Sequence, residues 1–214
     1  CGRKDIMSEK IKVAVVVGEH PYQIVPFQKA FESIDNIETY IQSLELFCAC
    51  SKQERQWYDV VIFYNFHMNT PSEQSALYDL GETNQGIFVL HHGILAFPEW
   101  DVWADITGIK NRKFNFFYDQ KVSYNIVNRT HPITAGIDDF SMTDETYTMD
   151  SASDGSNILI TTEHENSMKT IAWTRKYRNA NVFCLECGHD HVVYENEIFR
   201  KLLAQGIYWL YEKN

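Results

Sequence analysis

The part of the chain that decides the fold reads GIFVLHHG, from Gly86 to Gly93. Its first five residues, up to Leu90, contain no polar side chain, which is typical of a parallel strand with both faces buried. Two histidines, His91 and His92, follow directly and lead into Gly93. Ligands of open α/β sheets bind beyond the carboxyl ends of the strands. We therefore expect a buried parallel strand that ends at a functional turn.

The sequence before this strand alternates between strand and helix patterns. Its segments are a strand over Ile11–Val17, a helix over Pro26–Asp35, strands over Glu38–Leu46 and Tyr58–Tyr64, and a helix over Thr70–Leu80. The last helix begins with Thr-Pro-Ser-Glu, which supplies a capping residue, a proline in the first turn and an early acid. Strands and helices that alternate with short links predict a doubly wound, parallel sheet.

The sequence after Gly93 is richer in strands. The candidate strands are Val122–Val127, Ile158–Thr162, Thr170–Thr174 and Asn181–Cys187, and an amphipathic helix covers Asn196–Tyr211. No linker rich in proline, glycine or serine divides the chain. We therefore expect residues 11–214 to form a single domain, preceded by an N-terminal tether or tail over residues 1–10.

The composition is that of a chain with a substantial core, since 44% of its 214 residues are apolar. The net charge of −10 disfavours nucleic acid as a partner, because an acidic surface repels phosphates. No apolar run approaches the ~18 residues that a membrane span needs. Cys184 and Cys187 are three residues apart on a predicted strand and point to opposite faces, so we expect buried thiols rather than a zinc or redox pair.

The first residue is a cysteine, which leaves two interpretations open. In one, Cys1 is the mature, lipidated N-terminus of a lipoprotein of the cell envelope. In the other, Met7 is the natural start, residues 1–6 are not native, and the protein is cytoplasmic.

Polar residues gather at or after the ends of predicted strands. His91 and His92 follow one strand, His189 follows another, and Glu145 lies two residues before Tyr147. A carboxylate beside a tyrosine can supply a general acid or base. His91, His189 and a carboxylate also make up the ligands of a tetrahedral zinc site. The alternatives are a capping histidine, a solvated acidic turn and a surface loop.

Motifs of several large enzyme classes are missing. The chain has no G-x-S-x-G elbow, no G-x-G-x-x-G fingerprint and no P-loop. The segment Gly18-Glu19-His20, after the first strand, contains too little glycine to hold a pyrophosphate. Nucleotide and dinucleotide binding are therefore disfavoured.

A series of short motifs resembles the ThuA-like (trehalose-utilisation) family, over roughly Ile11 to Trp209. In chain order these motifs are Leu90-His91-His92-Gly93, Phe97-Pro98-Glu99-Trp100, Gly108, His131-Pro132-Ile133-Thr134-Ala135-Gly136-Ile137, Asp144-Glu145-Thr146-Tyr147, Ala172-Trp173-Thr174-Arg175, Gly188-His189-Asp190 and Ile207-Tyr208-Trp209. Each motif is weak alone, but together they keep the order of the family.

The resemblance implies an α/β fold like that of class I glutamine amidotransferases. This fold is a flavodoxin-like, three-layer α/β/α sandwich with a mostly parallel central sheet. It also implies a role in the use of trehalose, other disaccharides or their keto derivatives. The amidotransferases carry a nucleophilic cysteine where this chain has His91 and His92, and imidazole cannot form their thioester, so glutaminase activity is argued against.

The family pattern falls on His91, Glu145 and His189, which we expect to converge in one pocket at the carboxyl edge of the sheet. They would act as acid and base groups or as ligands of a divalent metal, with zinc favoured. His92, Trp100, Tyr147 and Trp173 are the candidate substrate-binding residues, with Trp103 as a further stacking face. The expected partner is a small-molecule sugar, and homo-oligomerisation stays open. The leading hypothesis is a sugar-processing enzyme, a hydrolase or a lyase, and the alternative is a non-catalytic sugar-binding or regulatory domain.

Overall fold

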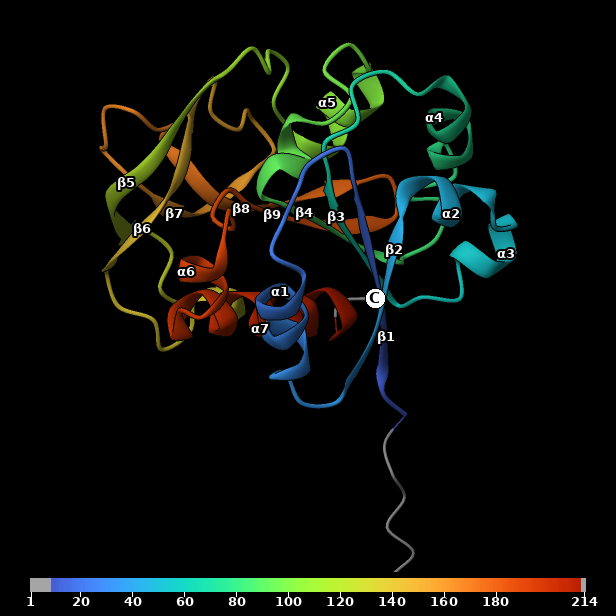
Figure 1. The fold of residues 1–214 in the computed structure, drawn as a ribbon, viewed down its shortest axis with the longest axis horizontal. Coiled ribbons are helices and arrows are strands. Elements are labelled where there is room, and N and C mark those ends of the chain that lie inside the picture. The colour runs from blue at the N-terminus through green and yellow to red at the C-terminus, as the bar shows by residue number, and fades with distance from the viewer. Residues whose placement is uncertain (1–8, 213–214) are drawn as a thin grey trace, which may run out of the picture.

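The computed structural model describes residues 9–212, and the expectations about Cys1 and residues 1–6 lie outside this range. One sheet runs through the middle of the molecule, with helices on both of its faces (Figure 1). In chain order the elements are β1 (Ile11–Gly18), α1 (Ile24–Glu32), β2 (Ile37–Ser43), α2 (Leu44–Ala49), α3 (Lys52–Arg55), β3 (Val60–Asn65), α4 (Pro71–Leu77), β4 (Gly86–Leu90), the 3₁₀ turn η1 (His91–Leu95), α5 (Asp101–Thr107), β5 (Asn115–Ile126), η2 (Pro132–Thr134), β6 (Phe140–Thr148), β7 (Asn157–Thr161), β8 (Thr170–Tyr177), β9 (Ala180–Leu185), α6 (His191–Tyr194) and α7 (Glu197–Glu212).

The sheet has nine strands within residues 9–212, in the order β2-β1-β3-β4-β9-β8-β7-β5-β6. Pairing is parallel from β2 to β9 and antiparallel from β9 to β6. The sheet is therefore mixed, and the expectation of a mostly parallel sheet was wrong. The reason is visible between β8 and β9, which only Arg178 and Asn179 separate. A parallel pair needs a crossover of about a dozen residues, whereas two residues suffice for a hairpin.

Two elements differ from the predicted pattern for local reasons. The predicted strand Glu38–Leu46 ends at Ser43, whose side chain accepts a hydrogen bond from the backbone N–H of Leu46 and so begins a helix. The segment around Asp144, for which an acidic turn was the alternative, is strand β6 and pairs with β5. Polar residues on β6 hid its strand character, because they face the interior of the protein instead of a solvated surface.

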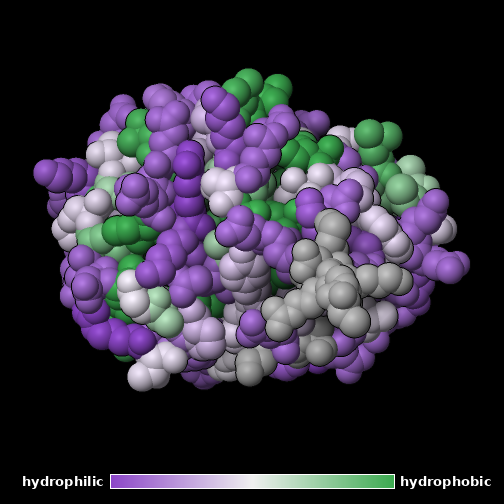
Figure 2. Space-filling model, turned by 90° about the horizontal axis from the view of Figure 1, so that it is seen from below, coloured by the Kyte–Doolittle hydropathy of each residue, from purple (hydrophilic) through white to green (hydrophobic). Residues whose placement is uncertain are grey.

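The two faces of the sheet carry separate apolar cores. Helices α1, α6 and α7 cover one face, and α2, α4 and α5 cover the other (Figure 1). Cys187 belongs to the first core and Cys184 to the second, and both are free thiols, as their spacing predicted. Seen from the side of α1 and α7, the surface is mainly hydrophilic, with apolar side chains in small groups (Figure 2). No helix within residues 9–212 is long and apolar enough to cross a membrane.

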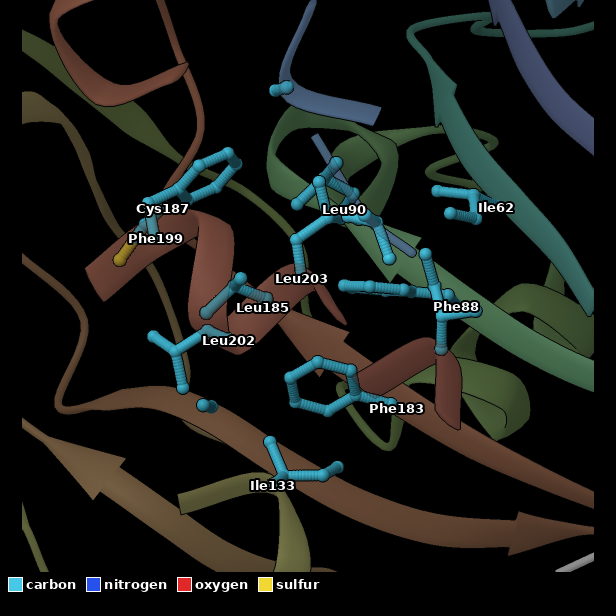
Figure 3. Packing of buried hydrophobic residues seen from close by; sticks show 14 of the residues in the cluster. Ile62, Phe88, Leu90, Ile133, Phe183, Leu185, Cys187, Phe199, Leu202 and Leu203 are labelled. Carbon is cyan, nitrogen blue, oxygen red and sulfur yellow. The ribbon is translucent and has the colours of Figure 1, made fainter. Parts of the chain in front are cut away.

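Helix α7 packs directly on the strands that lead into the polar turns. Its apolar face, which includes Leu202 and Leu203, meets side chains of β4 and β9 (Figure 3). At Gly206 the approach is so close that an added Cβ atom would lie 2.6 Å from Cδ1 of Phe183. This contact sets the distance between the helix and the middle of β4 and β9.

We predict that Gly206→Ala destabilises the protein by about 1–3 kcal/mol, because overpacking outweighs the ~1 kcal/mol gain in helix propensity. Chemical denaturation measures this change in the free energy of unfolding. Glu212→Ala, on an exposed position of the same helix, serves as the control and should stay within about 0.5 kcal/mol of the wild type. A variant Gly206→Ala that is as stable as the wild type would contradict the close packing.

Candidate functional site

The candidate site lies where the parallel and antiparallel halves of the sheet meet. His91 follows β4 directly, and His189 lies in the loop after β9. Glu145 and Tyr147 project from β6, which the chain brings back across the end of β9. The site thus occupies the carboxyl edge of the parallel strands, where open α/β sheets bind their ligands.

One carboxylate oxygen, Oε2 of Glu145, is the common partner of the polar side chains. It lies 3.2 Å from Nε2 of His91 and accepts a hydrogen bond of 2.7 Å from the hydroxyl of Tyr147. Nδ1 of His189 lies 3.0 Å from the same oxygen, close enough for an ion pair. The two groups are not aligned for a hydrogen bond. The Tyr147 oxygen is also 2.8 Å from Nε2 of His91. The structure therefore brings His91, Glu145 and His189 together with Tyr147, while their roles stay predictions.

His91 is held in a strained but well-supported conformation. Its φ of 51° lies in the left-handed region, which residues with a side chain seldom adopt. The ring is fully buried, and Nδ1–H donates a 2.6 Å hydrogen bond to the backbone carbonyl of Glu186. The turn after it needs Gly93, because a Cβ atom there would lie 2.2 Å from the carbonyl oxygen of Phe63. These contacts direct Nε2 of His91 toward Glu145.

Asp144, next to Glu145, fixes the loop that carries His189. Its carboxylate accepts hydrogen bonds from the backbone N–H groups of Gly188 at 2.9 Å, His189 at 3.1 Å and Glu145 at 2.8 Å. Burial raises the pKa of Asp144 to about 6, although the charge of His91 and the three N–H groups act to lower it. Asp144 is thus bound to the backbone and does not face a ligand.

The charges of the site are set by burial and by the shared carboxylate. Burial acts to raise the pKa of Glu145, but the contacts with His189, His91 and Tyr147 outweigh it and hold that pKa well below its usual range. Burial acts to lower the pKa of His189, but its contact with Glu145 raises it above the ordinary value. Burial raises the pKa of Tyr147 well above its ordinary value. Glu145 is therefore an anion, beside an imidazole that favours its protonated form and a neutral phenol.

Sequence reasoning missed Glu186, a third buried carboxyl group beside Asp144 and Glu145, which lies entirely inside the protein. One of its oxygens accepts a 3.2 Å hydrogen bond from the backbone N–H of Tyr147, and the other has no partner. Burial, reinforced by the charge of Asp144, raises the pKa of Glu186 well above its ordinary value. The signal in the sequence is an acid inside the apolar run that continues β9.

A cavity of about 150 Å³ opens beside Glu145 and Tyr147, which form part of its wall. A space of this size holds one six-membered ring. Its other lining residues include four aromatic side chains, Phe66, Phe114, Phe116 and Tyr118. A groove of about 400 Å³ that contains His189 and Asp190 adjoins it and shares His20 and Tyr118 with it. The alternation of Phe114, Phe116 and Tyr118 was a sequence signal for this wall.

The predicted substrate-binding and stacking residues lie elsewhere, with two exceptions. Trp173 is completely buried in the second core, and its Nε1–H donates to the backbone carbonyl of Thr107. Trp100 and Trp103 pack in the same core, so none of the three tryptophans can stack on a ligand in the cavity. Burial of these large apolar rings in the core stabilises the fold more than their exposure at the rim of the sheet would. Tyr147 and His92 do line the cavity. Burial and the charge of His91 lower the pKa of His92 well below its ordinary value.

Two groups of residues within the described chain have the donor atoms for a metal ion. One is His91, Glu145 and His189, whose ligand atoms all lie within 4.8 Å of one another. The other is Glu19, Glu45 and His67, in which both acids are exposed. Exposed acids of this kind commonly occur without an ion, so only the first group is a candidate centre.

The comparisons with known proteins agree with the fold. The sequence profile of the ThuA family, described as trehalose utilisation, matches residues 12–210. A ThuA-like protein from Parabacteroides merdae superposes with a TM-score of 0.76 at 16% identity, covering 94% of this chain and 90% of the other. A ThuA-like protein from Bacteroides uniformis gives 0.72 at 17% identity, covering 94% and 91%. A glutamine amidotransferase from Thermotoga maritima gives 0.57 at 9% identity, covering 94% and 98%. No curated protein matches the sequence.

We predict that Glu145→Gln lowers the pKa of His189, because burial then acts without the opposing carboxylate. An NMR titration of the His189 ring measures the pKa. The exposed pair of Glu163 with Lys169 supplies the control Glu163→Gln, which should leave the His189 titration unchanged.

The contact between Glu145 and His189 makes the stability of the protein depend on pH. The contribution of His189 is lost as the pH rises through its raised pKa, and that of Glu145 is lost as the pH falls through its lowered pKa. The wild type should therefore exceed Glu145→Gln in stability most clearly between the ordinary values of 4.5 and 6.5. A stability difference between the wild type and Glu145→Gln that is the same at every pH would contradict the pKa shifts assigned to Glu145 and His189.

Proposed function

The chain belongs to the ThuA, or trehalose-utilisation, family, and we propose that it is an enzyme that acts on a small carbohydrate by proton transfer. The observation that carries this proposal is the meeting of Glu145, Tyr147 and His189 at a cavity with aromatic walls. Aromatic faces suit the apolar sides of sugar rings, and the polar groups at one end supply an acid and a base.

The position of each side chain suggests its role. Tyr147 and Glu145 line the cavity, and His189 lines the adjoining groove, so these three can touch a bound molecule. His189 acts as the proton donor and acceptor, with Glu145 orienting and charging its ring. His91 lines neither space and acts as a positioning residue, through its contacts with Glu145 and Tyr147.

The arrangement of the acids argues for a lyase or isomerase type of proton transfer. Glycosidases of the two-carboxylate kind need a second acid that faces the substrate about 5–9.5 Å from the first. Asp144 is engaged by three backbone N–H groups, and Glu186 is completely buried. Asp190, in the adjoining groove, caps α6 by accepting a hydrogen bond from the backbone N–H of Val192. Glu145 is therefore the single carboxylate available at the cavity among the residues that line it. The thioester chemistry of amidotransferases is also disfavoured, because no cysteine lines the cavity.

The donor atoms favour a second candidate, metal-assisted hydrolysis. Ligands held at ~2.1 Å in a tetrahedral zinc site lie roughly 3.4 Å from one another. The Glu145 oxygen is 3.2 Å from Nε2 of His91 and 3.0 Å from Nδ1 of His189. Nδ1–H of His91 donates to a backbone carbonyl, as in metal-binding histidines. Zinc would be held by His91, Glu145 and His189 and would supply a Lewis acid.

We predict that Glu145→Gln and His189→Asn each lower the turnover of a responsive sugar by about 10²–10⁴-fold, because each removes part of the acid–base pair. The assay follows trehalose and its keto derivative by NMR, with Glu163→Gln as the matched acid control. Binding of a sugar by the wild type without turnover would support the alternative of a binding or regulatory domain.

A chelator separates the two candidate mechanisms. Activity and sugar-induced thermal stabilisation are measured before and after treatment with chelator, and after zinc is added back. Proton transfer by the side chains alone predicts no change. Loss of activity that zinc restores would favour metal-assisted hydrolysis and overturn the metal-free mechanism.

A further inference from the structure

Three histidines around the cavity each donate one ring N–H to a backbone carbonyl. Nδ1 of His91 contacts the carbonyl of Glu186 at 2.6 Å, Nε2 of His92 contacts that of Tyr64 at 3.0 Å, and Nδ1 of His20 contacts that of Pro21 at 2.8 Å. A carbonyl oxygen can only accept, so the proton of each neutral ring lies on that nitrogen. For the neutral rings of His92 and His20, the other ring nitrogen is then an acceptor: Nδ1 of His92 and Nε2 of His20.

The second ring nitrogen of His91, Nε2, already contacts Glu145 and Tyr147. Nδ1 of His92 has no hydrogen-bond partner and lies just beneath the cavity wall that His92 helps to form, so a ligand hydroxyl reaches it only when the surrounding wall shifts. A proton placed there would bury both a charge and an unpaired N–H, which is costly. His92 therefore stays a neutral acceptor, and a buried acceptor without a partner indicates a missing ligand or water.

His20 provides a second acceptor on the same wall. It follows β1 in the segment Gly18-Glu19-His20, and its ring stacks on His92 with centroids 4.2 Å apart and an angle of 30°. Phe66 contacts the His20 ring edge-on at 6.0 Å. His20 lines both the cavity and the adjoining groove. Two stacked imidazolium rings would repel each other at this distance, so the pair favours neutral rings.

We propose that Nε2 of His20 and Nδ1 of His92 form a subsite that accepts hydrogen bonds from two hydroxyl groups of a neutral polyol. The inference rests on the proposed function and deepens it, because it assigns a wall of the cavity to the hydroxyl groups of the substrate. This wall is built from the segments after β1, β3 and β4, whereas Glu145 and Tyr147 come from β6. Recognition and proton transfer would thus belong to different parts of the chain.

The geometry of the pair excludes other ligand classes. An imidazole lone pair lies in the plane of its ring, so two stacked rings do not direct their lone pairs at one ion. A metal ion or a single ammonium group therefore fits poorly, whereas two separate donor atoms fit well. A phosphate or carboxylate ligand offers mainly hydrogen-bond acceptors, which cannot pair with the acceptor nitrogens of His20 and His92. The anion of Glu145 would also repel it.

Four variants separate the acceptor nitrogens from the backbone contacts. In His20→Asn and His92→Gln, the amide can replace the nitrogen that donates to the carbonyl, while the acceptor is removed. In His20→Gln and His92→Asn the acceptor position keeps an amide, while the carbonyl contact is lost. Titration calorimetry at neutral pH measures the Kd for trehalose, glucose and glucose 6-phosphate, and thermal unfolding confirms that each variant is folded.

The expected result is that the wild type binds trehalose or glucose and that His20→Asn and His92→Gln each weaken this binding about tenfold, as expected for the loss of one hydrogen bond to a buried group. His20→Gln should weaken sugar binding less than His20→Asn does. If the His92 variants do not fold, this comparison alone tests the subsite. Wild-type affinity in His20→Asn, or tighter binding of glucose 6-phosphate than of glucose, would overturn the subsite and leave the proposed function in place. A wild type that binds neither trehalose nor glucose would overturn both.

Discussion

The buried negative charge of Glu145 is the constraint around which the site is organised. A carboxylate taken out of water must be compensated by donors or by positive charge. Here one oxygen is shared by an imidazole from the end of β4, an imidazole from the loop after β9 and a phenol from β6. The three groups come from distant parts of the sequence, so the carboxylate ties together the regions that build the cavity.

The mixed sheet explains how such a site can form. The parallel half ends in β4 and β9, whose carboxyl ends supply His91 and the loop of His189. The antiparallel half then returns β6 across this edge, where Asp144 binds the backbone of Gly188 and His189. A purely parallel sheet would have carried β6 away behind a crossover helix. The departure from the expected, mostly parallel sheet is thus the feature that places Glu145 opposite the histidines.

The parts of the fold that could be predicted are those in which local pattern and burial agree. β4 has the predicted bounds because its five residues are apolar and both faces are covered. β6 could not be recognised, because some of its polar residues are satisfied by partners far away in the sequence, such as Asp144 by the backbone of Gly188, 44 positions away. The family motifs pointed to His91, Glu145 and His189, but they could not separate Trp173, which is core, from the Phe and Tyr residues that line the cavity. Whether a residue of a motif lines the cavity depends on which face of the sheet its side chain occupies. Short motifs do not carry that information.

Strand β6 lies at the edge of the sheet, with β5 as its single neighbouring strand in the described order. The backbone of Tyr147, on β6, has two further partners: Glu186 accepts a hydrogen bond from its N–H, and the N–H of Met168 donates to its carbonyl. Edge elements with few backbone partners open at lower free energy than the centre of a sheet. We therefore expect the segment that carries the central carboxylate to open at a lower free energy than β1, β3 and β4. Such partial opening would make inactivation by heat a local event that precedes the loss of the sheet as a whole.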